Sequence, residues 1–109
     1  MISQKHYQYF NYLNEEKTDL PMEYKLYQNF PQTFYKFTKI GFDIPVKAHV
    51  RVNIYDVYGK LIKKLVDSEL LPGSYEVELN ALNYRPGVYY YKMFSGDYVD
   101  SKKVLLLKN

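Results

Sequence analysis

The sequence predicts an all-β domain, an antiparallel sandwich of about seven strands that follows an N-terminal extension. Three observations favour this fold class. Short segments with alternating apolar residues recur at intervals of roughly 8–12 residues, turns with Gly and Pro separate them, and the core region shows no convincing helical period. The 14 Tyr and 6 Phe residues also favour strands, because flat rings pack well on a pleated surface. With 109 residues, the chain has the length of a single domain.

The predicted extension or linker covers residues 1–23, which hold polar and aromatic residues without a sustained strand period. We expect a short helix from Tyr7 to Leu13 that docks on a partner. Tyr9, Phe10 and Leu13 are its candidate recognition residues, because aromatic and apolar side chains suit docking. The alternative is that the extension folds back on the sandwich and covers an edge strand.

The predicted sandwich domain covers residues 24–109, and its clearest strand is 49–56. There Val50, Val52 and Ile54 alternate with polar residues, so one face of the strand is apolar. The strands predicted along the chain are 24–28, 39–44, 49–56, 60–66, 74–79, 88–94 and 98–107. The side chains expected to be buried between the sheets are Val52, Ile54, Tyr75, Val77, Leu79, Val88 and Tyr90.

Four glycines separate these strands and mark the predicted turns: Gly59, Gly73, Gly87 and Gly96. A residue with a Cβ would strain a tight connection between two alternating segments. We therefore expect a positive φ at Gly96 and at one or more of the other three.

The residue types needed for catalysis or metal binding are sparse. Cysteine is absent, which excludes disulfides, thiolate metal sites and cysteine nucleophiles. The two histidines, His6 and His49, are not in a metal-ligand spacing. No phosphate-binding loop, nucleophile elbow or metalloprotease motif occurs. We therefore expect a non-catalytic protein without a cofactor or a metal site.

The charge of the chain is nearly balanced, with 15 basic and 12 acidic residues and a formal net charge of +3. This does not demand a polyanionic partner, and no nucleic acid is expected. Lys60, Lys63 and Lys64 cluster on one predicted hairpin, and Lys102 and Lys103 lie on the last strand. These lysines form either a basic face or, as we favour, a protection of exposed strand edges against pairing with other sheets.

No apolar segment has the length of a transmembrane helix or of a signal peptide. The expectation is that membrane association occurs only through a partner, and that the chain is cytoplasmic if it is the full gene product.

From Leu26 onward, several motifs in a fixed order resemble one known family. The motifs are Leu26-Tyr27-Gln28-Asn29-Phe30-Pro31, Val52-Asn53-Ile54-Tyr55-Asp56-Val57-Tyr58-Gly59, Pro72-Gly73-Ser74-Tyr75, Pro86-Gly87-Val88-Tyr89-Tyr90-Tyr91-Lys92 and Lys102-Lys103-Val104-Leu105-Leu106-Leu107-Lys108. Together they resemble the C-terminal sorting domain (type A) of the type IX secretion system of Bacteroidetes. An immunoglobulin-like domain of flagellar hook-capping proteins shares the turn pattern.

The resemblance implies an immunoglobulin-like sandwich attached to a cargo protein and recognised by an outer-membrane translocation apparatus. It also implies transfer from the periplasm to the cell surface. Within the matching motifs, the candidate recognition residues are Pro86, Gly87, Lys102, Lys103 and Lys108. The alternative is a stand-alone accessory subunit that docks into a larger cytoplasmic or membrane-attached complex through its N-terminal arm and aromatic surface.

Overall fold

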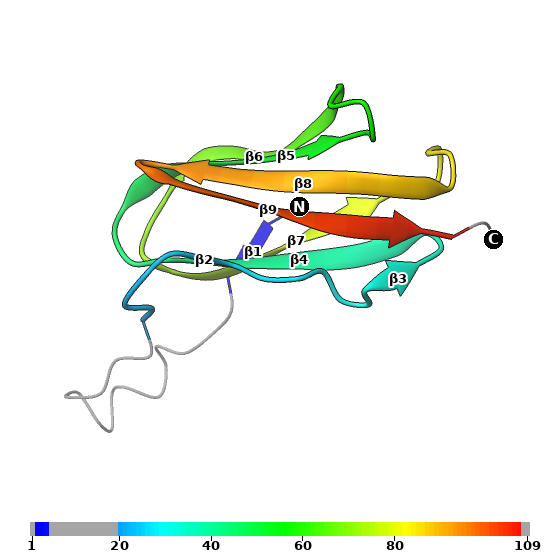
Figure 1. The fold of residues 1–109 in the computed structure, drawn as a ribbon. Coiled ribbons are helices and arrows are strands. Elements are labelled where there is room, and N and C mark those ends of the chain that lie inside the picture. The colour runs from blue at the N-terminus through cyan, green and yellow to red at the C-terminus, as the bar shows by residue number, and fades with distance from the viewer. Residues whose placement is uncertain (1, 5–19, 108–109) are drawn as a thin grey trace.

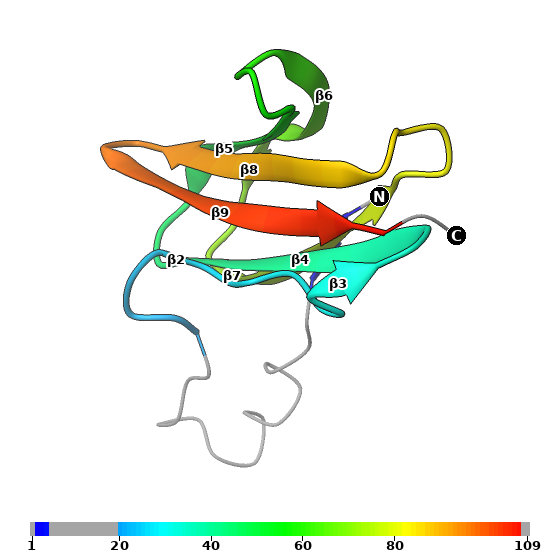
Figure 2. The same ribbon diagram turned by 45° about the vertical axis from the view of Figure 1, so that its right-hand side comes forward.

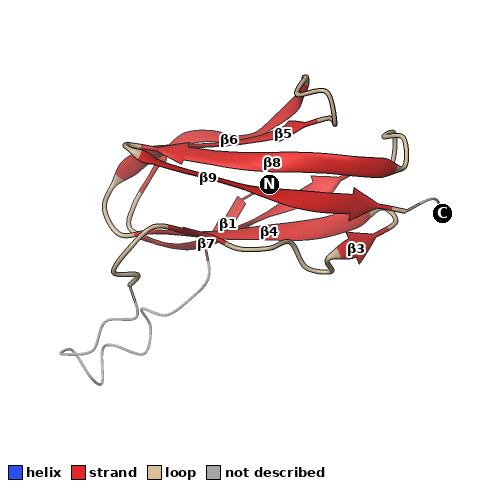
Figure 3. Cartoon of the chain, in the orientation of Figure 1, coloured by secondary structure: helices blue, strands red, loops and turns tan. Residues whose placement is uncertain are grey.

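The structure is a computed structural model that describes residues 2–4 and 20–107. These residues form two β-sheets that face each other, with all nine described strands in the two layers and no helix among them (Figure 1, Figure 3). The all-β, immunoglobulin-like sandwich predicted from the sequence is confirmed.

One layer is a four-stranded antiparallel sheet with the strand order β1-β7-β4-β2. Its strands are β1 (Ile2–Gln4), β2 (Lys25–Leu26), β4 (Phe37–Ile44) and β7 (Gly73–Asn80). β4 and β7 pair along their full length, from Phe37 opposite Asn80 to Ile44 opposite Gly73. They form the centre of this layer, with the short β1 and β2 at its edges.

The other layer is a five-stranded sheet with the strand order β3-β9-β8-β5-β6. Its strands are β3 (Thr33–Phe34), β5 (Ala48–Tyr55), β6 (Leu61–Leu70), β8 (Gly87–Ser95) and β9 (Tyr98–Leu106). β3 pairs with β9 in parallel, whereas the other pairs are antiparallel. Figure 2 shows β3 beside the end of β9, next to the four-stranded sheet.

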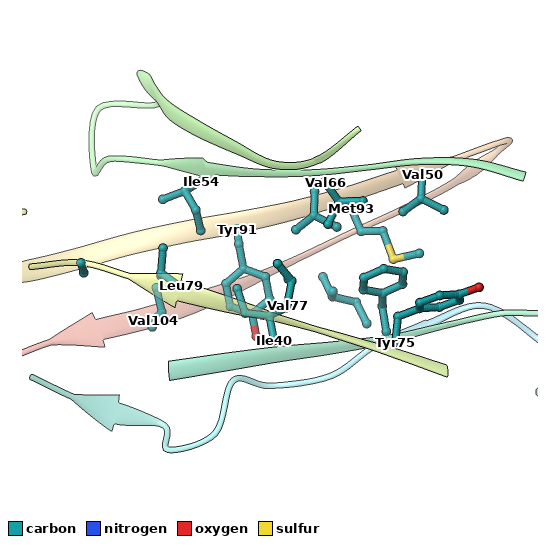
Figure 4. Close-up of a cluster of buried hydrophobic side chains, with 14 of the residues drawn as sticks. Ile40, Val50, Ile54, Val66, Tyr75, Val77, Leu79, Tyr91, Met93 and Val104 are labelled. Atoms are coloured by element: carbon teal, nitrogen blue, oxygen red, sulfur yellow. The ribbon is translucent and has the colours of Figure 1, made fainter. Parts of the chain in front are cut away.

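The core lies between the two layers, where apolar side chains from both sheets meet (Figure 4). Val52 and Ile54 of β5 point into it from one sheet, and Val77 and Leu79 of β7 from the other. The predicted burial of these side chains and of Tyr75 is confirmed. Burying side chains of this size stabilises the fold by about 1.5–3 kcal/mol each.

The prediction of which β8 side chains are buried was wrong, because the opposite face of the strand points into the core. Tyr91 and Met93 are completely buried, whereas Tyr90 is 38% exposed and Val88 is only half-buried. Aromatic and apolar residues occupy both faces of this strand, so its alternation does not specify which face is buried. Lys92, on the same face as Tyr90, is the residue that marks the outward side.

All four glycines have a positive φ, which confirms the prediction of φ, whereas Gly73 and Gly87 are the first residues of β7 and β8 and not turn residues. Gly59 has φ +83° and Gly96 has φ +57°, both in the region that side chains with a Cβ rarely adopt. These conformations close the β5–β6 and β8–β9 connections.

The start of the predicted extension belongs to the sheet. Ile2, Ser3 and Gln4 pair with β7 as an antiparallel edge strand, and Ile2 packs against the core. For these three residues the chain folds back and covers the edge of β7. This agrees with the alternative in which the extension covers an edge strand of the sandwich. The predicted helix from Tyr7 to Leu13 lies outside the described residues.

Candidate functional site

A groove of about 790 Å³ lies at one end of the sandwich. The β5–β6 turn, with Val57, Tyr58 and Lys60, lines one wall, and residues 83–89 line the other. Figure 1 shows both connections at the same end of the molecule, the green one above and the yellow one below. We refer to this feature as the end groove.

The β5–β6 turn is held by its own hydrogen bonds. The Asp56 carboxylate accepts the backbone N–H groups of Tyr58 and Lys60, each at 2.9 Å. The N–H of Gly59 donates to the carbonyl of Asp56 at 3.0 Å, and the positive φ of Gly59 allows this turn. The turn therefore presents Val57 and Tyr58 outward, and the Tyr58 side chain is 91% exposed.

The β7–β8 turn is fixed by two tyrosines. The Tyr89 hydroxyl donates to the carbonyl of Arg85 at 2.6 Å, and the rings of Tyr84 and Tyr89 lie 5.5 Å apart. The hydroxyl of Tyr84 is buried and has no hydrogen-bond partner among the described residues. Burial raises the pKa of both tyrosines above the usual value, so both remain neutral donors at physiological pH.

The chemistry of the end groove suits binding. An exposed aromatic ring and exposed apolar side chains lie beside the cations of Lys60 and Arg85. Among the described lining residues, the only carboxylate is that of Asp56, which accepts hydrogen bonds from two backbone amides within its turn. The groove can therefore hold an extended segment that presents apolar and acidic groups.

The sequence-predicted recognition residues do not form a single cluster. Pro86 and Gly87 line the end groove. Lys103 is exposed on the outer face of β9, whereas Lys102, on the opposite face of that strand, is half-buried with its ammonium 3.9 Å from Asp100. Neither lysine lines the groove.

Four of the proposed recognition residues lie outside the described part of the chain, namely Tyr9, Phe10, Leu13 and Lys108.

Sequence reasoning missed Tyr58 and Arg85 as groove residues. Tyr58 belongs to a turn within a matching motif, and Arg85 precedes Pro86 directly, so both signals were present. What joins them in space is the order of the strands: β5 and β8 are neighbours, so the turn after β5 lies beside the turn before β8.

The lysines on β6 and β9 differ in their setting. β6 is an edge strand of the five-stranded sheet, so the exposed Lys63 and Lys64 lie where edge protection was expected. β9 lies between β8 and β3. Its pairing with β3 is confined to Leu105 and Leu106, so among the described residues no strand pairs with that side of β9 at Lys102 and Lys103, and edge protection fits these lysines too.

Within residues 2–4 and 20–107, no group of three or more His, Cys, Asp or Glu residues is arranged to hold a metal ion. His49 is paired instead, with its Nε2 atom 2.5 Å from Oδ1 of Asp67. The hydrogen bond with His49 lowers the pKa of the Asp67 carboxyl. The same residues include no helix with the length and apolar character needed to cross a bilayer.

Comparison with known proteins adds one family. The family model described as "Secretion system C-terminal sorting domain" matches residues 35–107, which is more than half of the chain. The match covers both turns of the end groove. No curated protein matches the sequence.

Proposed function

Because the chain belongs to the family of secretion system C-terminal sorting domains, we propose that it is a non-catalytic recognition module that directs an attached protein across the outer membrane. The family implies a secretion sorting role and export toward the cell surface in general. The proposed finer role is that a component of the secretion machinery binds the end groove and thereby selects the attached protein.

The observation that carries this proposal is the groove itself. It is built from two turns within the matched residues, and it exposes the Tyr58 ring next to Lys60 and Arg85. Aromatic and Arg side chains contribute disproportionately to the free energy of protein–protein binding. A rigid turn that presents them loses little entropy on binding, because the Asp56 hydrogen bonds already fix its backbone.

The lining residues favour binding over chemistry. Burial raises the pKa of Tyr84, so its hydroxyl remains protonated and is a weak nucleophile. Among the described residues, those that line the groove include no histidine or cysteine.

The experiment is a secretion assay. A reporter protein with an export signal is fused in front of the chain and produced in a bacterium that has this secretion machinery. We expect the fused reporter at the cell surface or in the medium, and the same reporter without the chain in the periplasm. A fused reporter that stays in the periplasm would contradict the sorting function.

Groove variants test the site separately. Tyr58→Ala and Arg85→Ser should lower secretion of the reporter without lowering the melting temperature of the domain. Tyr35→Ala is the matched control, because Tyr35 is also exposed, at 55%, and does not line the groove. Normal secretion with both groove variants would reject the groove as the recognised surface while leaving the sorting function intact.

A further inference from the structure

The outer face of the five-stranded sheet carries a second candidate site, which adjoins the end groove at the β5–β6 turn, where Asp56 and Val57 line both. Outward-facing positions on β5, β8 and β9 hold the cations Arg51, Lys92 and Lys103 and no Asp or Glu. Among the described residues, neither Lys92 nor Lys103 forms an ion pair with a carboxylate. These two ammonium groups are therefore available to an anionic ligand.

The strand register interleaves these cations with aromatic rings. Tyr90 lies between Tyr55 of β5 and Lys103 of β9 as a direct cross-strand neighbour of both. In the next row, Lys92 lies between Asn53 and Ser101. Side chains directly opposite on adjacent strands have Cβ atoms about 4.5–5.5 Å apart, so each row forms a continuous surface.

A hollow of about 350 Å³ opens on these rows at the end near the β5–β6 turn. The residues that line it include Tyr55, Tyr90, Lys92, Ser101 and Asp56. We refer to it as the sheet hollow. It thus combines apolar rings with a cation, a carboxylate and a hydroxyl.

A buried polar atom beside the hollow also lacks a partner. Asn53 is only 9% exposed, and its Nδ2 atom donates to the hydroxyl of Tyr55 at 3.1 Å. Its Oδ1 atom has no hydrogen-bond partner among the described residues. This atom is inaccessible to solvent, and Asn53 lies beside the hollow without lining it.

We propose that the sheet hollow binds a uronic-acid residue of an acidic polysaccharide. A pyranose ring presents C–H groups on one face, and the half-buried Tyr55 and the exposed Tyr90 give that face an apolar platform. Lys92 and Lys103 pair with the sugar carboxylate. A sugar hydroxyl donates to the carboxylate of Asp56.

The carboxylate of Asp56 suits a sugar ligand, because it can accept hydrogen bonds from sugar hydroxyls. The aromatic ring next along the sheet, that of Phe94, is already in contact with Arg51 and Lys92, with the cations 5.7 and 5.4 Å from the ring centre. This leaves Tyr55 and Tyr90 as the platform for a ligand.

The test is a titration of the full 109-residue chain with trigalacturonate, followed by NMR chemical shifts, with maltotriose as the neutral trisaccharide. We expect saturable shifts at Tyr55, Tyr90 and Lys92 with trigalacturonate and at least tenfold weaker binding of maltotriose. Lys92→Gln and Tyr90→Ala should each weaken trigalacturonate binding about tenfold or more. Lys47→Gln and Tyr35→Ala, at exposed positions outside the hollow, are the matched controls.

Several outcomes would overturn the proposal. They are the absence of saturable binding, equal binding of the neutral trisaccharide, unchanged binding in both hollow variants, or tighter binding of a thymidine oligonucleotide. If Tyr90→Ala lowers the melting temperature, Tyr90→Leu replaces it, because leucine keeps apolar cover but removes the ring. The result is independent of the secretion assay, since neither Tyr90 nor Lys92 lines the end groove.

Discussion

The hydroxyl of Tyr91 donates a hydrogen bond to the backbone carbonyl of Tyr27, 2.6 Å away. Tyr91 belongs to β8 of the five-stranded sheet, and Tyr27 directly follows β2 of the other sheet. The bond therefore links the two layers across the core, in which the Tyr91 side chain is completely buried (Figure 4). It allows a polar group to lie in the core with its hydrogen bond satisfied.

The first prediction concerns this bond. Tyr91→Phe should lower the free energy of unfolding by about 1–3 kcal/mol, because it leaves the Tyr27 carbonyl without this donor. Urea denaturation of the two proteins measures the difference. Tyr35→Phe is the control and should change stability little, since Tyr35 is exposed. A Tyr91→Phe protein as stable as the parent would contradict the role assigned to the bond.

The second prediction concerns alkaline pH. Burial raises the pKa of Tyr91 well above its ordinary value of 10.0, and burial also raises the pKa values of Tyr75, Tyr84, Tyr89 and Tyr98. Above about pH 10 the unfolded chain releases protons that the folded chain retains, so the free energy of unfolding should fall as pH rises. Below that pH this contribution is fully present.

Urea midpoints measured from about pH 8 to about pH 11 test this dependence. The Tyr91→Phe protein should lose less stability over the alkaline range than the parent, because it lacks the group with the largest raised pKa. If the urea midpoints of the two proteins fell equally with rising pH, Tyr91 would not contribute to the pH dependence of stability.

The third prediction tests the register of β8. Met93→Ala should cost about 2–5 kcal/mol of stability, because Met93 is completely buried in the core. Tyr90→Ala removes a larger side chain but should cost only about 1 kcal/mol, because Tyr90 faces outward. Thermal or urea unfolding separates the two variants. The reverse order of costs would mean that the strand is shifted by one residue.

The sequence predicts the long strands well because their alternation and their turns agree. In β5, Val50, Val52 and Ile54 share a face, and all three are completely buried. In β8 the same reasoning fails, since apolar residues on both faces leave only Lys92 to distinguish the outward side. Periodicity therefore locates a strand more reliably than it orients one.

The two strands that the sequence does not predict, β1 and β3, depend on pairing with distant segments of the folded chain. β1 and β3 have three and two residues, too few for a period. β3 is defined by its parallel pairing with Leu105 and Leu106 of β9, which are more than 70 residues away in sequence. The burial of the polar Asn29 side chain also depends on the folded chain. Its amide donates hydrogen bonds to the carbonyls of Pro31 and Gln32 and to the Thr38 hydroxyl, and these groups come together only in the fold.

Two of the recognition candidates, Pro86 and Gly87, line the end groove, and their role in recognition stays a prediction. Pro86 and Gly87 stand out in the sequence because they belong to the most specific motif, whereas Tyr58 lies in a separate motif almost 30 residues earlier. These residues lie close together because β5 and β8 are neighbours in the sheet, and this strand order cannot be deduced from composition or spacing. Alternation does explain why Lys102 and Lys103, adjacent in sequence, lie on opposite faces.

The most direct test of the proposed recognition is site-specific photocrosslinking during secretion. The chain, fused to the exported reporter, carries p-benzoylphenylalanine in place of Tyr58 or, as the control, in place of Tyr35. Irradiation of secreting cells should join the Tyr58-substituted protein, and not the Tyr35-substituted one, to an outer-membrane component of the secretion machinery. Equal crosslinking from both positions, or crosslinking from Tyr35 alone, would contradict recognition through the end groove.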